Sequence, residues 1–145
     1  MFTHEFFMKE AIREAHKAFE MDEVPIGAVI VCNDIIIAKG HNLTQTLSDV
    51  TAHAEMQAIT SSSEYLGGKY LDLCTLYVTL EPCPMCAGAL YWSHLGTLVY
   101  GAGDSKKGYS LFNPDLLHPR TTVISGILQD ASATLLKDFF AKKRR

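Results

Sequence analysis

A chain of 145 residues, 48% hydrophobic and 20% charged, suffices for one domain with its own core and has none of the composition of a disordered protein. No apolar run reaches the length of a membrane span, and the first residues lack the features of a signal peptide. We therefore expect a cytoplasmic protein with no membrane part. Its net charge of −3 gives no argument by itself for a nucleic-acid partner.

The first half of the chain predicts a helix, a hairpin and a second helix. Residues 3–22 place apolar side chains at three- and four-residue steps, as an amphipathic helix does. Two β-branched runs, 26–32 and 35–38, are separated by Asn33-Asp34, which predicts a hairpin. Residues 52–61 predict a helix that opens at the sequence His-Ala-Glu.

The second half predicts strands alternating with helices. The link between its last two strands is about twenty residues long, which suits a crossover, so we expect these strands to be parallel. The expected fold is a single α/β domain over 1–145, with three layers (α/β/α) and a mixed five-stranded sheet. The predicted elements are a strand at 75–80, a helix at 84–94, a strand at 97–100, a short helix at Pro114–Leu117, a strand containing Val123 and Ile124, and a helix at 129–142.

The C-terminal end is basic. Residues 137–145 hold five basic residues and one acid, whereas residues 1–136 hold eight basic and fifteen acidic residues. This asymmetry indicates an end that meets an anionic partner, or else an ordinary solvated tail.

Three soft metal ligands are spaced as in a catalytic zinc site. His53 is followed about thirty residues later by Cys83 and Cys86 in Pro-Cys-Pro-Met-Cys. Three protein ligands leave the fourth tetrahedral position to water. Glu55, next to a ligand without needing to be one, is placed to move protons to and from that water. We expect one Zn²⁺ per chain and Glu55 as the acid/base.

The Cys-x-x-Cys pair also occurs in redox motifs and in four-cysteine zinc sites. A redox pair would not require the upstream His-x-Glu, and a four-cysteine structural site would need Cys32 and Cys74. Those two lie singly in apolar, strand-like runs, so we interpret both as core residues. Two thiolate ligands also fit a reducing cytoplasm.

The chain resembles the cytidine deaminase superfamily, whose zinc enzymes carry H-x-E and P-C-x-x-C, and within it the bacterial tRNA-specific adenosine deaminases. The resemblance runs over nearly the whole length. It includes Glu23-Val24-Pro25-Ile26-Gly27, Gly40-His41-Asn42, Thr51-Ala52-His53-Ala54-Glu55, Leu80-Glu81-Pro82-Cys83 and Asp138-Phe139-Phe140.

This resemblance implies hydrolytic deamination of adenosine to inosine at the wobble position of a tRNA anticodon stem-loop, by a homodimer. It also implies that Asn42 contacts the flipped-out nucleoside, with Asp104 and Phe139 or Phe140 beside the substrate strand. Asn42 and Asp104 could instead be turn residues. Helical periodicity puts Phe139 in the core, which leaves Phe140 as the stacking candidate.

Some residues depart from that pattern. Pro84 inside the cysteine motif and Tyr91-Trp92 after it resemble guanine deaminases, which share the fold and the zinc site but act on a free base. Gly103 and the segment 108–112 also differ from the expected loop. A free purine or nucleoside deaminase therefore remains an alternative, as does a binding module, although a binding module would not need Glu55.

Overall fold

A five-stranded mixed sheet forms the centre of the molecule. The computed structural model describes residues 2–144. The strands are β1 (Gly27–Cys32), β2 (Ile35–His41), β3 (Thr75–Leu80), β4 (Thr97–Ala102) and β5 (Thr122–Ser125), in the spatial order β2-β1-β3-β4-β5. β1 is antiparallel to β2 and β3, whereas β3, β4 and β5 are parallel to one another. The mixed sheet and the parallel last pair are as predicted.

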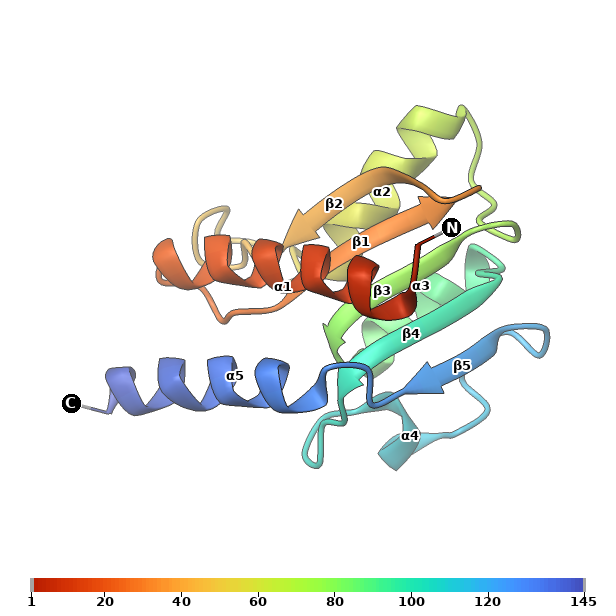
Figure 1. Ribbon diagram of the computed structural model, residues 1–145. Coiled ribbons are helices and arrows are strands. Elements are labelled where there is room, and N and C mark those ends of the chain that lie inside the picture. Colours follow the sequence, from red (N-terminus) through yellow and green to blue (C-terminus); the bar gives the residue numbers. More distant parts are fainter. Residues whose placement is uncertain (1, 145) are drawn as a thin grey trace.

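Helices cover both faces of the sheet (Figure 1). One face carries α1 (His4–Glu20) and α5 (Gln129–Lys143), which lie side by side; the other carries α2 (Ala54–Leu66) and α3 (Pro84–Trp92). Alternate side chains of β1 point to opposite faces: Ile30 packs in the core under α2 and α3, and Val29 packs under α1. The α/β/α expectation is confirmed.

Local sequence explains several element boundaries. Thr3 caps α1 by accepting a 3.1 Å hydrogen bond from the N–H of Phe6. Asn33 and Asp34 both have positive φ, 53° and 59°, which suits the tight turn of the predicted hairpin. Gly40 lets α2 pack against β2, because a Cβ there would lie 2.6 Å from the backbone oxygen of Ala54.

The short helix was predicted in the wrong place. The helix α4 spans Tyr109–Phe112, and the predicted Pro114–Leu117 is not helical. Asn113 is extended, and its side-chain oxygen accepts the N–H of Asp115 at 2.9 Å. This local bond favours a turn and ends the helix before the proline. Other boundaries moved less: α2 runs on to Leu66, where Gly67 in the left-handed conformation ends it.

The start of one strand and the ends of three others lie together on one side of the sheet. The start of β1 lies beside the end of β2, with Gly27 opposite His41, and beside the end of β3. The end of β3 lies beside the end of β4, with Leu80 opposite Ala102. The segments that leave these ends hold the candidate site. Within residues 2–144, no helix has both the length and the apolar character that a bilayer crossing needs.

Candidate metal centre and substrate pocket

Two helix N-termini place the three soft ligands together. His53 is the residue before α2 and Cys83 the residue before α3, and both have extended backbone conformations. The Nδ1 atom of His53 lies 3.6 Å from the Sγ atom of Cys83 and 3.5 Å from that of Cys86. Among the described residues this is the one group of three such side chains close enough to share an ion, with donor atoms within 4.8 Å of one another.

These distances fit a tetrahedral zinc ion. Zn–S bonds of ~2.3 Å and Zn–N bonds of ~2.05 Å at tetrahedral angles separate sulfur from nitrogen by ~3.6 Å. Each helix start also carries unpaired N–H groups and a partial positive charge, which favour thiolate over thiol. Three protein donors can therefore hold one metal ion at this point.

The two thiols at this centre have pKa values shifted in opposite directions. The hydrogen bond from Cys86, with help from His53, lowers the pKa of Cys83 to about 4. The same interaction with Cys83, together with burial, raises the pKa of Cys86. The hydrogen bond with Cys83 outweighs burial and raises the pKa of His53. Of the two thiols, Cys83 thus loses its proton more readily.

Glu55 lies beside the centre in the first turn of α2. It is 4% exposed, and burial raises its pKa to about 7, with the charge of Cys83 adding to the effect. A carboxyl group whose pKa lies near neutrality can both accept and donate a proton at working pH. Glu55 is therefore suited to acid/base work, as expected from its position next to His53.

The other two cysteines lie apart from this group. Cys74 is buried, and burial raises its pKa to about 12. Cys32 is partly exposed, and its thiol lies 3.6 Å from the backbone oxygen of Leu73. Neither belongs to the group that could hold a metal, so the four-cysteine alternative is excluded for the described residues.

A cavity of about 720 Å³ opens over His53, Glu55 and Cys83. Its walls include three segments: the chain around Asn42 and Thr44, the loop 103–107, and one face of α5. Glu81, at the end of β3, also lines it. The lining residues of α5 and the residue directly after it recur at three- and four-residue steps: Ala133, Leu136, Phe140 and Arg144.

Buried acids hold the wall that contains Asn42. The amide N–H groups of Gln45 and Thr46 donate to Glu23 at 3.1 and 2.6 Å, and the Thr46 hydroxyl donates at 2.6 Å. Burial alone would raise the pKa of Glu23, but these hydrogen bonds outweigh it and lower that pKa. Asn42 itself is 6% exposed, and its backbone N–H donates to Ile26.

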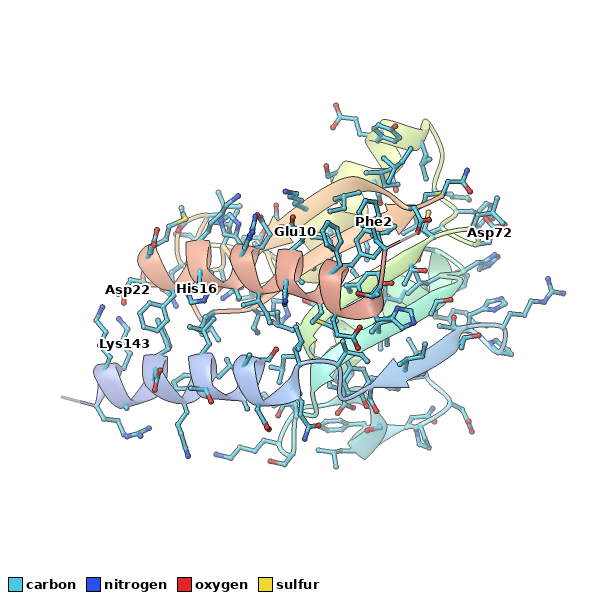
Figure 2. All side chains as sticks on the ribbon, in the orientation of Figure 1. Phe2, Glu10, His16, Asp22, Asp72 and Lys143 are labelled. Atoms are coloured by element: carbon cyan, nitrogen blue, oxygen red, sulfur yellow. The ribbon has the colours of Figure 1, made fainter. Side chains whose placement is uncertain are left out.

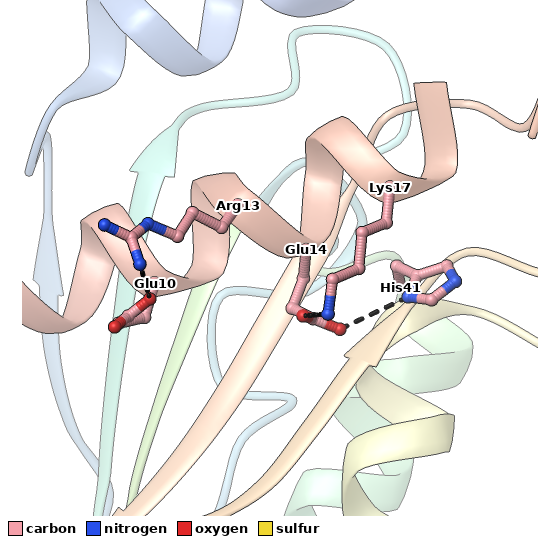
Figure 3. Close-up of polar contacts among 5 residues, drawn as sticks. All are labelled: Glu10, Arg13, Glu14, Lys17 and His41. Carbon is pink, nitrogen blue, oxygen red and sulfur yellow. Dashed lines mark hydrogen bonds and ion pairs between the residues drawn. The ribbon is translucent and has the colours of Figure 1, made fainter. Parts of the chain in front are cut away.

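A second buried acid ties helix α1 to the residue before Asn42 (Figure 3). Glu14 contacts His41 at 3.2 Å and Lys17 at 2.6 Å. Burial would raise the pKa of Glu14, yet its bonds with Lys17 and His41 outweigh burial and hold that pKa below its ordinary value. The end of β2 is thus fixed from α1 as well as by the sheet.

The opposite wall contains Asp104 and Phe140. The Asp104 carboxylate accepts the backbone N–H groups of Lys106 and Lys107, both at 3.0 Å, so it forms a turn while lining the pocket. Phe140 is 44% exposed and lines the pocket, whereas Phe139 is 4% exposed and packs edge-on against Phe19 at 5.7 Å. The core position predicted for Phe139 is confirmed.

The basic end is not a free tail. Lys143 forms an ion pair with Asp22 across α5 and the end of α1, and both side chains are labelled in Figure 2. Lys142 lies 5.5 Å from the ring centre of Phe19. Of the terminal basic residues, Arg144 lines the pocket, and Arg145 lies outside the described residues. Sequence reasoning missed these roles, and it also missed Lys106 and Lys107 beside the pocket.

Known proteins share both the sequence and the fold. Residues 2–144 match the family described as MafB19-like deaminase. The tRNA-specific adenosine deaminase of Bacillus subtilis is 46% identical over 150 aligned residues, covering 100% of this chain and 93% of that protein.

Two solved structures are informative. One, from a study of A-to-I editing by tRNA:A34 deaminases, has a TM-score of 0.83 and 43% identity, covering 90% of this chain and 98% of its own. The guanine deaminase of Bacillus subtilis has a TM-score of 0.70 and 38% identity, covering 81% and 79%. The chain therefore belongs to the MafB19-like deaminases, within the cytidine deaminase superfamily.

Proposed function

We propose that this chain is a zinc-dependent hydrolytic deaminase that converts adenosine to inosine at the wobble position of a tRNA anticodon. The observation that carries the proposal is the buried Glu55 beside His53, Cys83 and Cys86 at the base of an open pocket. The extent of the likeness to tRNA-specific adenosine deaminases supports the choice of substrate. A cytoplasmic location is part of the proposal, since a reducing compartment preserves the thiolate ligands.

His53, Cys83 and Cys86 would hold the zinc ion. When bound, zinc supplies a Lewis acid that makes water easier to deprotonate. Two thiolates donate strongly and reduce that effect, so a base close to the water is needed. Glu55 is that base in this proposal.

Glu55 then moves the protons of the reaction. It accepts a proton from water as the oxygen attacks C6 of adenine and donates that proton to ring nitrogen N1. It then accepts the proton of the new C6 hydroxyl group and delivers it to the amine, which leaves as ammonia as the C6 carbonyl forms. One water is consumed and one ammonia released, and Glu55 ends in its starting state. A carboxyl pKa near 7 suits both halves of this exchange.

The walls of the pocket suit a base extruded from an RNA strand. Asn42 is buried where it could hydrogen-bond a nucleoside, and Phe140 offers a partly exposed ring for a neighbouring base. Lys106, Lys107 and Arg144 add positive charge to the same walls, as contacts with a phosphate backbone require. We also propose that Asp104 lies beside the substrate strand, in addition to forming its turn.

We also propose that two copies associate through α3. This helix is apolar all round, yet one side remains exposed, with Met85 and Tyr91 each 38% and Trp92 75% exposed. Exposed aromatic residues that adjoin one another are typical of interaction surfaces. Sedimentation of wild type and Trp92→Asp tests this: wild type should be a dimer, and the variant should shift toward monomer.

A free-base guanine deaminase is the second candidate, favoured by Pro84, by Tyr91-Trp92 and by the 38% identity to such an enzyme. Purified protein should be offered an anticodon stem-loop with a wobble adenosine and, separately, free guanine. Inosine without xanthine is the expected result. Xanthine without inosine would replace the proposal with the guanine activity.

A further inference from the structure

A buried carboxylate that is not a metal ligand connects the metal-binding segment to the opposite pocket wall. Glu81 stands two residues before Cys83 and is 6% exposed. Its oxygens accept hydrogen bonds from the N–H of Asp104 at 3.1 Å, and from the N–H and hydroxyl of Ser110 at 3.1 and 2.6 Å. These bonds join Asp104, in the loop that lines the pocket, to Ser110 in α4, and so hold the segment 104–110.

No cation neutralises this acid at short range. Among residues 2–144, the ion pairs within 4.0 Å use Glu10, Glu14 and Asp22, and none uses Glu81. Hydrogen bonds to a charged acceptor are stronger than neutral ones, and a buried charge left without them is costly. The hydrogen bonds from Asp104 and Ser110 therefore stabilise this buried carboxylate.

The loop is fitted closely around Glu81. A Cβ built at Gly108 would lie 2.4 Å from the carboxyl carbon of Glu81 and 2.5 Å from each of its oxygens. The next residue, Tyr109, donates its backbone N–H to Pro82 at 2.9 Å. A side chain at 108 would thus displace the Glu81 carboxyl group from its present place, and the loop contacts the metal-binding segment at successive residues.

We propose that Glu81 is a positioning residue for the substrate: by holding residues 104–110, its carboxylate sets where Asp104, Lys106 and Lys107 stand relative to the metal centre. This inference rests on the proposed function, because those three residues line the same cavity as Glu55. Glu81 also lines this cavity, but its hydrogen bonds among the described residues run to Asp104 and Ser110, so we assign its effect to the loop.

Glu81→Gln keeps the size of the side chain but turns an N–H₂ group toward donors that need an acceptor. The loop should loosen, so the KM for the stem-loop should rise about tenfold or more, while kcat at saturation changes much less. Zinc content should stay at the wild-type value. Amide hydrogen exchange at Asp104 and Ser110 should become faster. The matched control is Glu64→Gln, an exposed acid on α2.

Gly108→Ala provides an independent route to the same loop without removing the carboxylate. It should also raise KM, and this cost should largely disappear in a Glu81→Ala background, where the methyl group no longer meets a carboxylate. This variant carries the test if Glu81→Gln does not fold.

The proposal is supported if Glu81→Gln raises KM and keeps its zinc, and if the effect of Gly108→Ala on KM largely disappears in the Glu81→Ala background. Unchanged KM and unchanged amide exchange in Glu81→Gln would overturn it. Zinc loss with kcat falling in step would also overturn it, by making Glu81 a support for the metal centre. If wild-type protein leaves the stem-loop unmodified, the proposed function fails together with the substrate role, and amide exchange still decides whether Glu81 holds the loop.

Discussion

The metal end of the pocket and its outer wall are built in different ways. The metal end uses residues before and within the first turns of α2 and α3, fixed by short motifs and largely removed from solvent. The outer wall uses the loop 103–107 and α5, where Phe140 and the lysines remain exposed. The chemistry therefore depends on local spacing, whereas substrate contact depends on how distant segments dock.

The outer wall depends on contacts that hold α5 against α1. Phe139 packs against Phe19 of α1, and Lys143 pairs with Asp22 just beyond α1. These contacts turn the face with Leu136, Phe140 and Arg144 toward the pocket. If the two regions differ in this way, substitutions at the metal end should abolish the reaction. Substitutions in the outer wall should only reduce the efficiency with which the substrate is converted.

The largest effect is expected from Cys86→Ala. Removing one of three ligands should release zinc, reduce deamination below detection and lower stability, because metal binding contributes to folding. Elemental analysis and thermal unfolding measure this. Cys32→Ala, outside the metal group, serves as the control and should keep its zinc. Full zinc occupancy in Cys86→Ala would refute the ligand assignment.

Glu55→Gln should keep fold and zinc but lose turnover by about 10²–10⁴ or more, since a positioned acid/base contributes on that order. Inosine formation and metal content are measured on the same sample. A variant that loses its metal would show that Glu55 is a ligand. The assignment of Glu55 to proton transfer and not to metal binding would then be wrong.

At the wall, Asn42→Ala should reduce kcat/KM on the stem-loop by an amount worth about 1–3 kcal/mol, because a buried polar partner of the nucleoside is lost. Steady-state kinetics give the value, with zinc content as the control. Unchanged efficiency would leave Asn42 as a turn residue only.

Glu23 should make the Asn42 wall sensitive to acid. Its pKa is lowered from the ordinary 4.5, so its ionisation stabilises the fold above pH 4.5, and this contribution is lost as pH falls through the lower folded value. Glu23→Gln should therefore cost stability at pH 7, by about 1–3 kcal/mol. The cost should shrink on acidification below pH 4.5. Urea unfolding at several pH values measures it, and the exposed Glu20→Gln should show little change at any pH.

The smallest expected effect separates two neighbouring basic residues. Arg144 lines the pocket and Lys143 is engaged with Asp22. Arg144→Gln should flatten the slope of log affinity for tRNA against log salt by about 0.7–0.9 if it contacts one phosphate. Lys143→Gln should leave that slope unchanged. Equal changes in both would mean that Lys143 leaves Asp22 to bind RNA.

Sequence predicted best what is encoded locally. The strand Thr75–Leu80 and the positions of His53 and Cys83 at helix starts follow from apolar runs, motif spacing and Pro84. The position of α4 was missed because the Asn113 side chain accepts a hydrogen bond from the N–H of Asp115, which hydrophobic periodicity does not reveal and which favours a turn there. The intramolecular contacts of the basic end could not be predicted, because the partners of Lys142 and Lys143 lie more than a hundred residues away in sequence.

Deamination of the stem-loop in ¹⁸O-labelled water tests the central claim most directly. Hydrolysis at C6 predicts inosine with one solvent oxygen and one ammonia released per inosine, with both products formed by Glu55→Gln about 10²–10⁴ times more slowly, or more slowly still. An unaltered wobble adenosine in the wild-type reaction, with guanine converted to xanthine in the parallel sample, would contradict the account.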